Sequence, residues 1–506
     1  MGVFAFAPIF TDGMVLQRDQ KITVWGRADS EGTVRVYLGD YCSESNVMDG
    51  EWKCTFPPME AATGLTLLAK QGSDFLRVQN VMIGDVWLAG GQSNMEFFLR
   101  YETHFEETKA LPANPLIRMY TCPRVAYEGQ QPYQSGCGYW FGEGDSAWET
   151  FSSAAYWFAR ELQPELQVPV GIISCNWGGT SASAWVPGES LSDGPLKVYL
   201  EDYEAAAAQM DPEENRERSL RGWAFQKDPD HMKEWAGVMY GIDRSAQLER
   251  LVNRAGNPAV PMGPYNKNRP GCLFEQMIGP IRNCKVRGVL WYQGENDVHH
   301  APLYSLLFTN LITQWRKLWG EDLPFIFAQL APFGEWLALD GADFPEIRRQ
   351  QQTAADTIPG CYMISTSDVG MRYDIHPKEK KVLGHRYFLQ AMDKVYGQPT
   401  LAEAPVMDKG YIDRDRIVLE YRNSGQGLTL QGKAKGFVIW QDDKRLEPEE
   451  VVVAGRTTVL RFDRQIKAPV RIEFAQTPYY EVNICNSAGI PALPACISLE
   501  VTDDFC

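Results

Sequence analysis

One serine, one histidine and one aspartate in this sequence have the types and surroundings that nucleophilic catalysis requires. Ser93 lies two positions after an apolar run that ends in Gly90-Gly91, and His376, one of six histidines, lies two positions after Asp374 and just before a proline. A serine attacks a carbonyl when an adjacent base takes its proton, and a carboxylate on one imidazole nitrogen orients the other. From these stretches alone, a helix N-cap at Ser93 fits as well, and a structural loop histidine fits His376 better.

Amide side chains and paired glycines follow two further apolar runs. Gln293 and Asn296 come after the run 288–292, and Gly179 comes after the run 170–174, within Trp177-Gly178-Gly179-Thr180. Amides donate hydrogen bonds without titrating, and glycines let backbone N–H groups approach a ligand closely. Both features suit an oxyanion hole. Capping of the next helix by acidic residues, and a tight structural turn at the glycines, are the competing interpretations.

These chemical stretches all follow predicted strands. Between residues 81 and 400, apolar strand candidates alternate with amphipathic helical stretches, which predicts a parallel sheet flanked by helices. The predicted strands are Val81–Ala89, Ile117–Tyr120, Val170–Ser174, Gly288–Trp291, Phe325–Leu330 and Tyr362–Thr366, and the helices include Ser153–Leu166, Tyr304–Leu318 and Ile347–Thr357. Open α/β sheets place their ligand crevice at the carboxyl ends of the strands. We therefore expect the candidate residues to meet at that edge.

The chain on either side of this region has the short alternating pattern of β-structure. Residues 1–80 consist of short β-branched runs separated by glycines, and residues 401–506 alternate with period 2. We predict an N-terminal β-rich module at 1–80, an α/β domain at 81–400 and a C-terminal β-rich module at 401–506. A charged segment at 188–270 interrupts the alternation, and it predicts either a helical insertion or lid or a solvated surface excursion.

Composition excludes several classes of function. The net charge is −16 without a basic run, which argues against nucleic acid as a partner. No apolar run reaches the roughly 18 residues of a membrane span. The eleven cysteines lack zinc-ligand spacing and His299-His300 lack a third ligand, so we predict no metal and no cofactor. Buried-type cysteines and the absence of a visible leader favour the cytoplasm, or a secreted or periplasmic location if a leader was removed. The oligomeric state stays open.

Taken together, these stretches resemble the sialate O-acetylesterase family of SGNH-type hydrolases over nearly the whole chain. The resemblance implies an α/β fold, namely an SGNH-hydrolase (flavodoxin-like) three-layer α/β/α domain with a parallel sheet, flanked by N- and C-terminal β-sandwich-like modules. The blocks that carry it are Phe10-Thr11-Asp12-Gly13-Met14-Val15-Leu16-Gln17-Arg18, Gly84-Asp85-Val86-Trp87, Gly91-Gln92-Ser93-Asn94-Met95-Glu96, Trp177-Gly178-Gly179-Thr180, Trp291-Tyr292-Gln293-Gly294-Glu295, Asp374-Ile375-His376-Pro377-Lys378 and Asn483-Ile484-Cys485-Asn486-Ser487-Ala488-Gly489-Ile490-Pro491.

The same resemblance assigns roles to individual residues. Ser93 is then the nucleophile and His376 the base, with the oxyanion held by the Ser93 N–H, by Gly179 and by Gln293 or Asn296. Many SGNH enzymes place the orienting aspartate three residues before the histidine, where this chain has Tyr373. Two alternatives follow: Asp374 orients His376, or a backbone carbonyl does so and leaves a dyad. The residues predicted to contact the substrate are Asn94, Glu295, Trp177 and Arg372.

The predicted activity is that of a serine esterase that removes O-acetyl groups from carbohydrates, with 9-O-acetylated sialic acid as the substrate that the family implies. Its partners are the acetylated sugar and water. The sialic acid carboxylate calls for an arginine, and the candidates are Arg100, Arg348, Arg349 and Arg372. Acetylxylan or another acetylated glycan is the alternative substrate. Transfer of acetyl between sugars and non-catalytic carbohydrate binding are the alternative functions.

Overall fold

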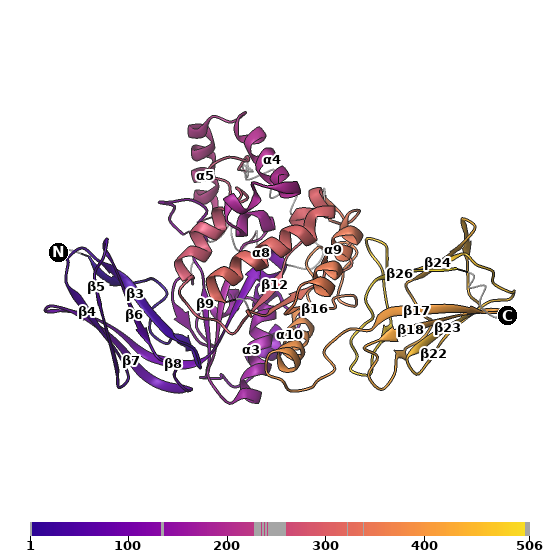
Figure 1. The fold of residues 1–506 in the computed structure, drawn as a ribbon, viewed down its shortest axis with the longest axis horizontal. Helices are drawn as coiled ribbons and strands as arrows, with labels where there is room; N and C mark the ends of the chain where they lie inside the picture. Colours follow the sequence, from indigo (N-terminus) through magenta and orange to yellow (C-terminus); the bar gives the residue numbers. More distant parts are fainter. Residues whose placement is uncertain are drawn as a thin grey trace.

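The computed structural model describes residues 3–132, 136–226, 260–320, 322–336 and 339–500, together with Glu234, Gly237 and Tyr240. A central α/β part lies between a β-rich N-terminal part and a β-rich C-terminal part, in a row along the long axis of the molecule (Figure 1). This confirms the predicted mixed α/β architecture with flanking β modules. None of the described helices combines the length and the hydropathy that crossing a membrane requires.

The central sheet is built around one long strand, β8 (Asp74–Gly91). Its strand order is β10-β9-β11-β8-β12-β13-β16, and every neighbouring pair is parallel except β10 with β9. The other bounds are β9 (Ile117–Thr121), β10 (Trp140–Phe141), β11 (Val170–Asn176), β12 (Gly288–Tyr292), β13 (Phe325–Ala328) and β16 (Cys361–Ile364). All six predicted strands are present. Their apolar runs are continuous rather than alternating because helices cover the sheet on both faces.

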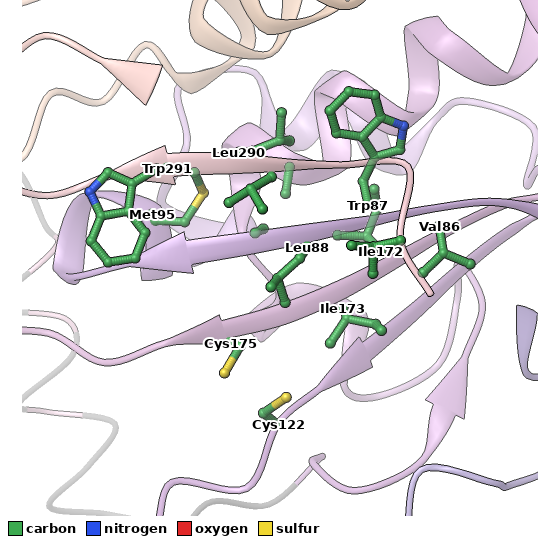
Figure 2. Packing of buried hydrophobic residues seen from close by; sticks show 14 of the residues in the cluster. Val86, Trp87, Leu88, Met95, Cys122, Ile172, Ile173, Cys175, Leu290 and Trp291 are labelled. Carbon is green, nitrogen blue, oxygen red and sulfur yellow. The ribbon is translucent and has the colours of Figure 1, made fainter. Parts of the chain in front are cut away.

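The helices pack on the sheet in two pairs. α3 (Ser153–Leu166) contacts α10 (Lys380–Lys394), and α8 (Tyr304–Trp319) contacts α9 (Phe344–Thr357). The Trp87 ring of β8 lies 5.0 Å from Phe158 of α3, whereas a Cβ on Gly90 would lie 3.2 Å from Trp315 of α8. Positions three apart on a strand point to opposite faces, so the pairs lie on opposite sides. Figure 2 shows the apolar side chains of β8, β11 and β12 that fill this core.

Strand β8 also belongs to the N-terminal module. Its first half pairs antiparallel with β7 (Ala62–Gln71), its middle pairs with β2 (Val15–Gln17), and its second half pairs with β11 and β12. The predicted boundary at residue 80 therefore falls inside a continuous strand. The remaining strands of this module are β1 (Phe4–Phe6), β3 (Ile22–Ala28), β4 (Thr33–Leu38), β5 (Tyr41–Asn46) and β6 (Glu51–Phe56).

The C-terminal module has a hydrophobic core of its own. One sheet consists of β17 (Val406–Asp413), β18 (Arg416–Arg422), β23 (Thr457–Arg461) and β22 (Glu450–Ala454), and another of β21 (Lys444–Leu446), β20 (Phe437–Gln441), β24 (Val470–Phe474) and β26 (Ala495–Leu499). A short pair joins β19 (Thr429–Leu430) to β25 (Ile484–Cys485). The period-2 pattern of the sequence matches this alternation of buried and exposed positions.

The segment 188–270 is helical in its first part. It contains α4 (Lys197–Ala207) and α5 (Pro212–Gln226), which rise from the central domain in Figure 1. Most of 227–259 lies outside the described residues. Short elements near the sheet edge are α1 (Ser93–Glu96), η1 (Leu99–Tyr101), α2 (Phe105–Lys109), η8 (Glu295–Leu303), β14 (Glu335–Trp336) and β15 (Leu339–Asp340).

A buried carboxylate connects the N-terminal module to the central sheet. Asp85 of β8 is fully buried and accepts hydrogen bonds from Arg18 at 3.0 Å, from Arg287 at 3.0 Å, from Gln17 at 3.0 Å and from Tyr396 at 3.0 Å. Burial alone raises the pKa of this carboxyl group, but the donors and the two guanidinium charges outweigh burial and hold its pKa below the ordinary value. Asp85 is therefore ionised and fully paired.

Replacing Asp85 by asparagine leaves two guanidinium groups around a neutral side chain. We expect Asp85→Asn to lower the free energy of unfolding by about 3 kcal/mol, because one partner of a buried ion pair is removed. Chemical denaturation of the purified variant measures this change. Asp19→Asn is the matched control, since Asp19 contacts the same arginines from a side chain that is 53% exposed. A loss for Asp85→Asn as small as that of Asp19→Asn contradicts the assignment.

Candidate active site

A close approach of two strands displays Ser93 at the edge of the sheet. Gly91 has φ +133°, and a Cβ on it would lie 2.2 Å from the carbonyl oxygen of Tyr292, so no side chain fits there. The next residue, Gln92, donates its N–H to the same carbonyl at 3.1 Å and is the N-cap of α1. Ser93 is thus the first residue of α1 and not its N-cap. Its hydroxyl lies at the carboxyl end of β8.

The structure brings His376 to this hydroxyl. The Nε2 atom of His376 lies 3.0 Å from the Ser93 Oγ, although 283 residues separate the two. The imidazole ring is 2% exposed and is flanked edge-on by Tyr240 at 5.3 Å and by Trp336 at 5.4 Å. Burial lowers the pKa of His376 below its ordinary value, and Asp374 acts in the opposite direction. A neutral imidazole can accept the hydroxyl proton.

Asp374 lies on the other side of the imidazole. Its Oδ1 accepts the backbone N–H of His376 at 2.8 Å and lies 3.4 Å from Nδ1 of the ring. Its Oδ2 lies 2.8 Å from the Lys378 ammonium, and His376 and Lys378 together outweigh burial and lower the pKa of this carboxyl group. Among the described residues no carbonyl accepts a hydrogen bond from Nδ1. Tyr373 is 67% exposed, and the Asp374 carboxylate is the charged group that lies 3.4 Å from Nδ1.

The paired glycines lie directly beside the serine. A Cβ on Gly178 would lie 3.2 Å from the Cβ of Ser93, and the Gly178 N–H donates to Glu96 of α1 at 2.6 Å. Gly179 has φ +66°, and its carbonyl accepts a hydrogen bond from Asn268 at 3.0 Å. These bonds fix the glycine loop against the first turn of α1. A side chain at Gly178 would crowd the candidate nucleophile, so the loop lies this close to Ser93 only because glycine occupies that position.

The two candidate amide donors occupy different environments. Gln293 is fully buried, and its amide nitrogen donates to the Thr180 carbonyl at 3.2 Å and to the Asp297 carboxylate. Both of its N–H groups are therefore used inside the protein, which does not fit the oxyanion role predicted for Gln293. Asn296 donates one N–H to Asn268 at 3.3 Å on the exposed side of the glycine loop. That bond uses one of the two N–H groups of the Asn296 amide, so Asn296 stays a candidate oxyanion donor.

The four residues predicted to contact the substrate lie in two different environments. Asn94 and Glu295 are buried and hydrogen-bonded to each other at 2.5 Å, and the Trp177 side chain is 4% exposed. These three side chains are buried and expose little surface to a ligand. Arg372 is exposed, and its guanidinium lies 4.5 Å from the ring centre of Tyr479. It stays the candidate that a ligand can reach.

Several residues of the site escaped the sequence analysis. Tyr240 comes from the helical segment and donates its hydroxyl to Glu96 at 3.3 Å, and Trp336 comes from β14. Lys380 is buried two residues beyond Lys378. Aromatic residues and lysines are frequent in the sequence, and no spacing distinguishes Tyr240, Trp336 or Lys380 from the others. The one sequence signal for a lysine at the site is that the Asp374–Lys378 block ends in Lys378.

One group of side chains near the site has the geometry of a metal centre. Glu102, His104 and Glu379 place one ligand atom each within 4.8 Å of one another. His104 already pairs with Glu379 at 3.2 Å and with Glu107 at 3.3 Å. The group therefore has internal partners, and none of its members contacts Ser93 or His376.

The pair of adjacent histidines in the sequence, His299-His300, lies elsewhere in the fold, in η8. Its His300 ring pairs with the Asp202 carboxylate at 2.7 Å.

Comparison with known proteins places this geometry in context. Residues 257–393 match the family model of carbohydrate esterases described as sialic acid-specific acetylesterase. The sialate O-acetylesterase of Rattus norvegicus is 27% identical over 88% of this chain and 82% of its own, and that of Homo sapiens is 24% identical over 80% and 74%. A carbohydrate acetylesterase from Xanthomonas citri has a TM-score of 0.74 and 25% identity over 99% of this chain and 100% of its own. These matches confirm the resemblance to the sialate O-acetylesterase family and indicate a carboxylic ester hydrolase.

Proposed function

We propose that this chain hydrolyses acetyl esters of sugar hydroxyls through an acyl-enzyme on Ser93, in an SGNH-type domain. The observation that carries the proposal is the 3.0 Å contact between the Ser93 hydroxyl and the buried His376 imidazole at the carboxyl end of the sheet. A nucleophile, a base and an orienting carboxylate within this reach are the elements of acyl transfer. The confirmed similarity to carbohydrate esterases supports the sugar as the alcohol part of the ester.

The reaction follows from the positions of these groups. His376 takes the Ser93 proton while the oxygen attacks the acetyl carbonyl, and Asp374 stabilises the imidazolium that forms. The backbone N–H groups of Ser93 and Gly179 and the Asn296 amide receive the oxyanion, at about 2.7–4 kcal/mol for one such donor. The imidazolium then protonates the departing sugar hydroxyl. Water, activated by the same imidazole, releases acetate and restores Ser93.

The proposed substrate is 9-O-acetylated sialic acid, because the curated relatives are sialate O-acetylesterases. Its carboxylate needs a cation, and the four arginines differ in their freedom to provide one. Arg348 is 2% exposed and donates to the Thr477 carbonyl, whereas Arg349 pairs with Glu346. The Arg100 guanidinium lies over the Tyr101 ring at 5.0 Å. Arg372 is exposed on the loop that carries His376, and we assign the carboxylate contact to it.

Removal of either reacting side chain tests the mechanism. We expect Ser93→Ala to lower kcat on the order of 10⁴-fold or more, and His376→Ala by a similar factor, because the two act as a unit. Acetate release from 9-O-acetylated sialic acid and from acetylated xylo-oligosaccharides measures it. His385→Ala, an exposed histidine that pairs with Glu161, is the control. Full activity in Ser93→Ala rules out the mechanism, whereas no acetate release by the native chain favours the carbohydrate-binding alternative.

The buried imidazole sets the acidic limit of activity. His376 accepts a proton only when neutral, and burial lowers its pKa, so we expect kcat/KM to fall with decreasing pH at a midpoint below about 6.5. Asp374→Asn removes the charge that favours the imidazolium, so the midpoint moves to still lower pH and kcat decreases. The pH dependence of kcat/KM for both proteins measures this. A native midpoint above 7, or an upward shift in Asp374→Asn, contradicts the assignment.

The role of Arg372 predicts a substrate-dependent effect. We expect Arg372→Gln to raise KM for 9-O-acetylated sialic acid about fivefold, the value of an exposed ion pair, and to leave KM for neutral acetylated xylo-oligosaccharides unchanged. Arg349→Gln is the matched control, since its side chain is exposed and faces Glu346. An equal change for both substrates assigns Arg372 a structural role. Faster hydrolysis of xylo-oligosaccharides by the native chain moves the substrate to acetylated xylan and keeps the mechanism.

A further inference from the structure

A lysine that takes no part in the proposed reaction is buried beneath the active site. Lys380 is fully buried although it is the first residue of α10. A cation at a helix N-terminus opposes the helix dipole, and a buried ammonium loses its hydration. Burial lowers the pKa of Lys380 to about 7, with Glu295 acting in the opposite direction. A position with these costs requires a compensating function.

The Lys380 ammonium fixes the orientation of one amide. Its Nζ donates to Asn94 Oδ1 at 2.7 Å, and an ammonium can only donate. The Asn94 amide nitrogen therefore points the other way, where it donates to Glu295 at 2.5 Å and to the Ile375 carbonyl at 3.0 Å. Asn94 directly follows Ser93, and Ile375 directly precedes His376. One amide thus joins the residue after the nucleophile to the residue before the base.

The surroundings hold the ammonium in this position. Its Nζ lies 4.9 Å from the ring centre of Phe97 and 5.1 Å from that of Tyr292, within the range of cation–π attraction. Lys378 lies over the same Phe97 ring at 5.3 Å but contacts Asp374 instead. The second Glu295 oxygen is buried without a hydrogen-bond partner among the described residues. The positive charge of Lys380 therefore also compensates the Glu295 carboxylate.

We infer that Lys380 is a positioning residue for the proposed esterase reaction: through Asn94 it sets the distance between the Ser93 hydroxyl and the His376 imidazole. The inference rests on the proposed function where acetate release from a sugar is measured. The Ser93–His376 contact can be probed independently of that function with a small fluorophosphonate. That reagent bonds to the Ser93 oxygen with loss of fluoride while His376 takes the proton. Its rate reports the alignment of the pair without the sugar.

Lys380→Met tests the inference, since methionine keeps an unbranched apolar side chain, one atom shorter than lysine, and donates no hydrogen bond. We expect kcat for acetate release and the rate of Ser93 labelling to fall on the order of 100-fold, the scale of a misplaced reacting group, with KM changed less than about twofold. Lys381→Met is the matched control, because Lys381 lies over Trp157 of α3 at 4.7 Å. It removes a neighbouring charge, and we expect its rates to equal those of the native chain.

A second variant separates positioning from stability. Lys380→Met leaves the buried Glu295 carboxylate without its neighbouring cation, and adding Glu295→Gln removes the carboxylate charge. We expect the double variant to regain thermal stability while kcat and labelling stay low. Native rates in a folded Lys380→Met, or recovery of rate together with stability in the double variant, overturn the inference. Serine labelling of the native chain without acetate release overturns the proposed function, and the labelling comparison still decides the role of Lys380.

Discussion

The contact between the end of β8 and the carbonyl of Tyr292 is the constraint on which the rest of the site depends. Gly91 can lie against that carbonyl because it has no Cβ, and its positive φ directs the chain out of the sheet into α1. The Gln92 N–H donates a hydrogen bond to the same Tyr292 carbonyl. Ser93 follows at once, so the position of its hydroxyl is set by the backbone of two central strands. A site built on rigid elements holds its reacting atoms more accurately than one built on loops alone.

The second half of the site depends on buried charges that are paired. His376 lies on a loop, and three interactions hold that loop: Asp374 bonds to the His376 backbone, Lys378 contacts Asp374, and Asn94 bonds to the Ile375 carbonyl. Each buried ion loses hydration, and each recovers part of it from a partner of opposite charge or from a donor. The same principle operates at Asp85, where guanidinium groups from two segments bind one carboxylate. Burial thus gives the loop a single arrangement.

The flanking modules contribute to the site through the continuity of the chain. β8 begins in the N-terminal module and ends at Gly91, so the strand that positions Ser93 is anchored at both ends. On the other side, the loop of Arg372 meets Tyr479 of the C-terminal module, and Arg348 of α9 donates to the Thr477 carbonyl. The N-terminal module therefore contacts the central domain through β8, and the C-terminal module contacts it through the Arg372 loop and α9.

The sequence by itself determined the strands, their order along the chain and the residue types of the candidate nucleophile, base and orienting carboxylate. Continuous apolar runs predicted β11 and β12 within two residues and the second half of β8, because strands buried on both faces leave a local signature. The first half of β8, from Asp74 to Asn80, belongs to the N-terminal module and lacks that continuous run. The runs at 325–330 and 362–366 were drawn two residues too long, since their last residues stay buried after leaving the ladder. The local pattern of apolar residues indicates which residues are buried. It does not indicate where the hydrogen bonds between strands end.

Only the tertiary structure decided which polar groups stay accessible at the edge of the sheet. Gln293 and Asn296 are both amides after the same strand, yet one bonds to Asp297 inside the protein and the other lies at the surface. Asn94 and Glu295 pair across a separation of 201 residues, and Tyr240 reaches the imidazole from the helical segment. Such contacts join residues far apart in the chain, and their energies depend on distances and burial that no local spacing encodes. The sequence was enough to identify the chemical groups, whereas their hydrogen-bond partners depend on how the residues pack at the edge of the sheet.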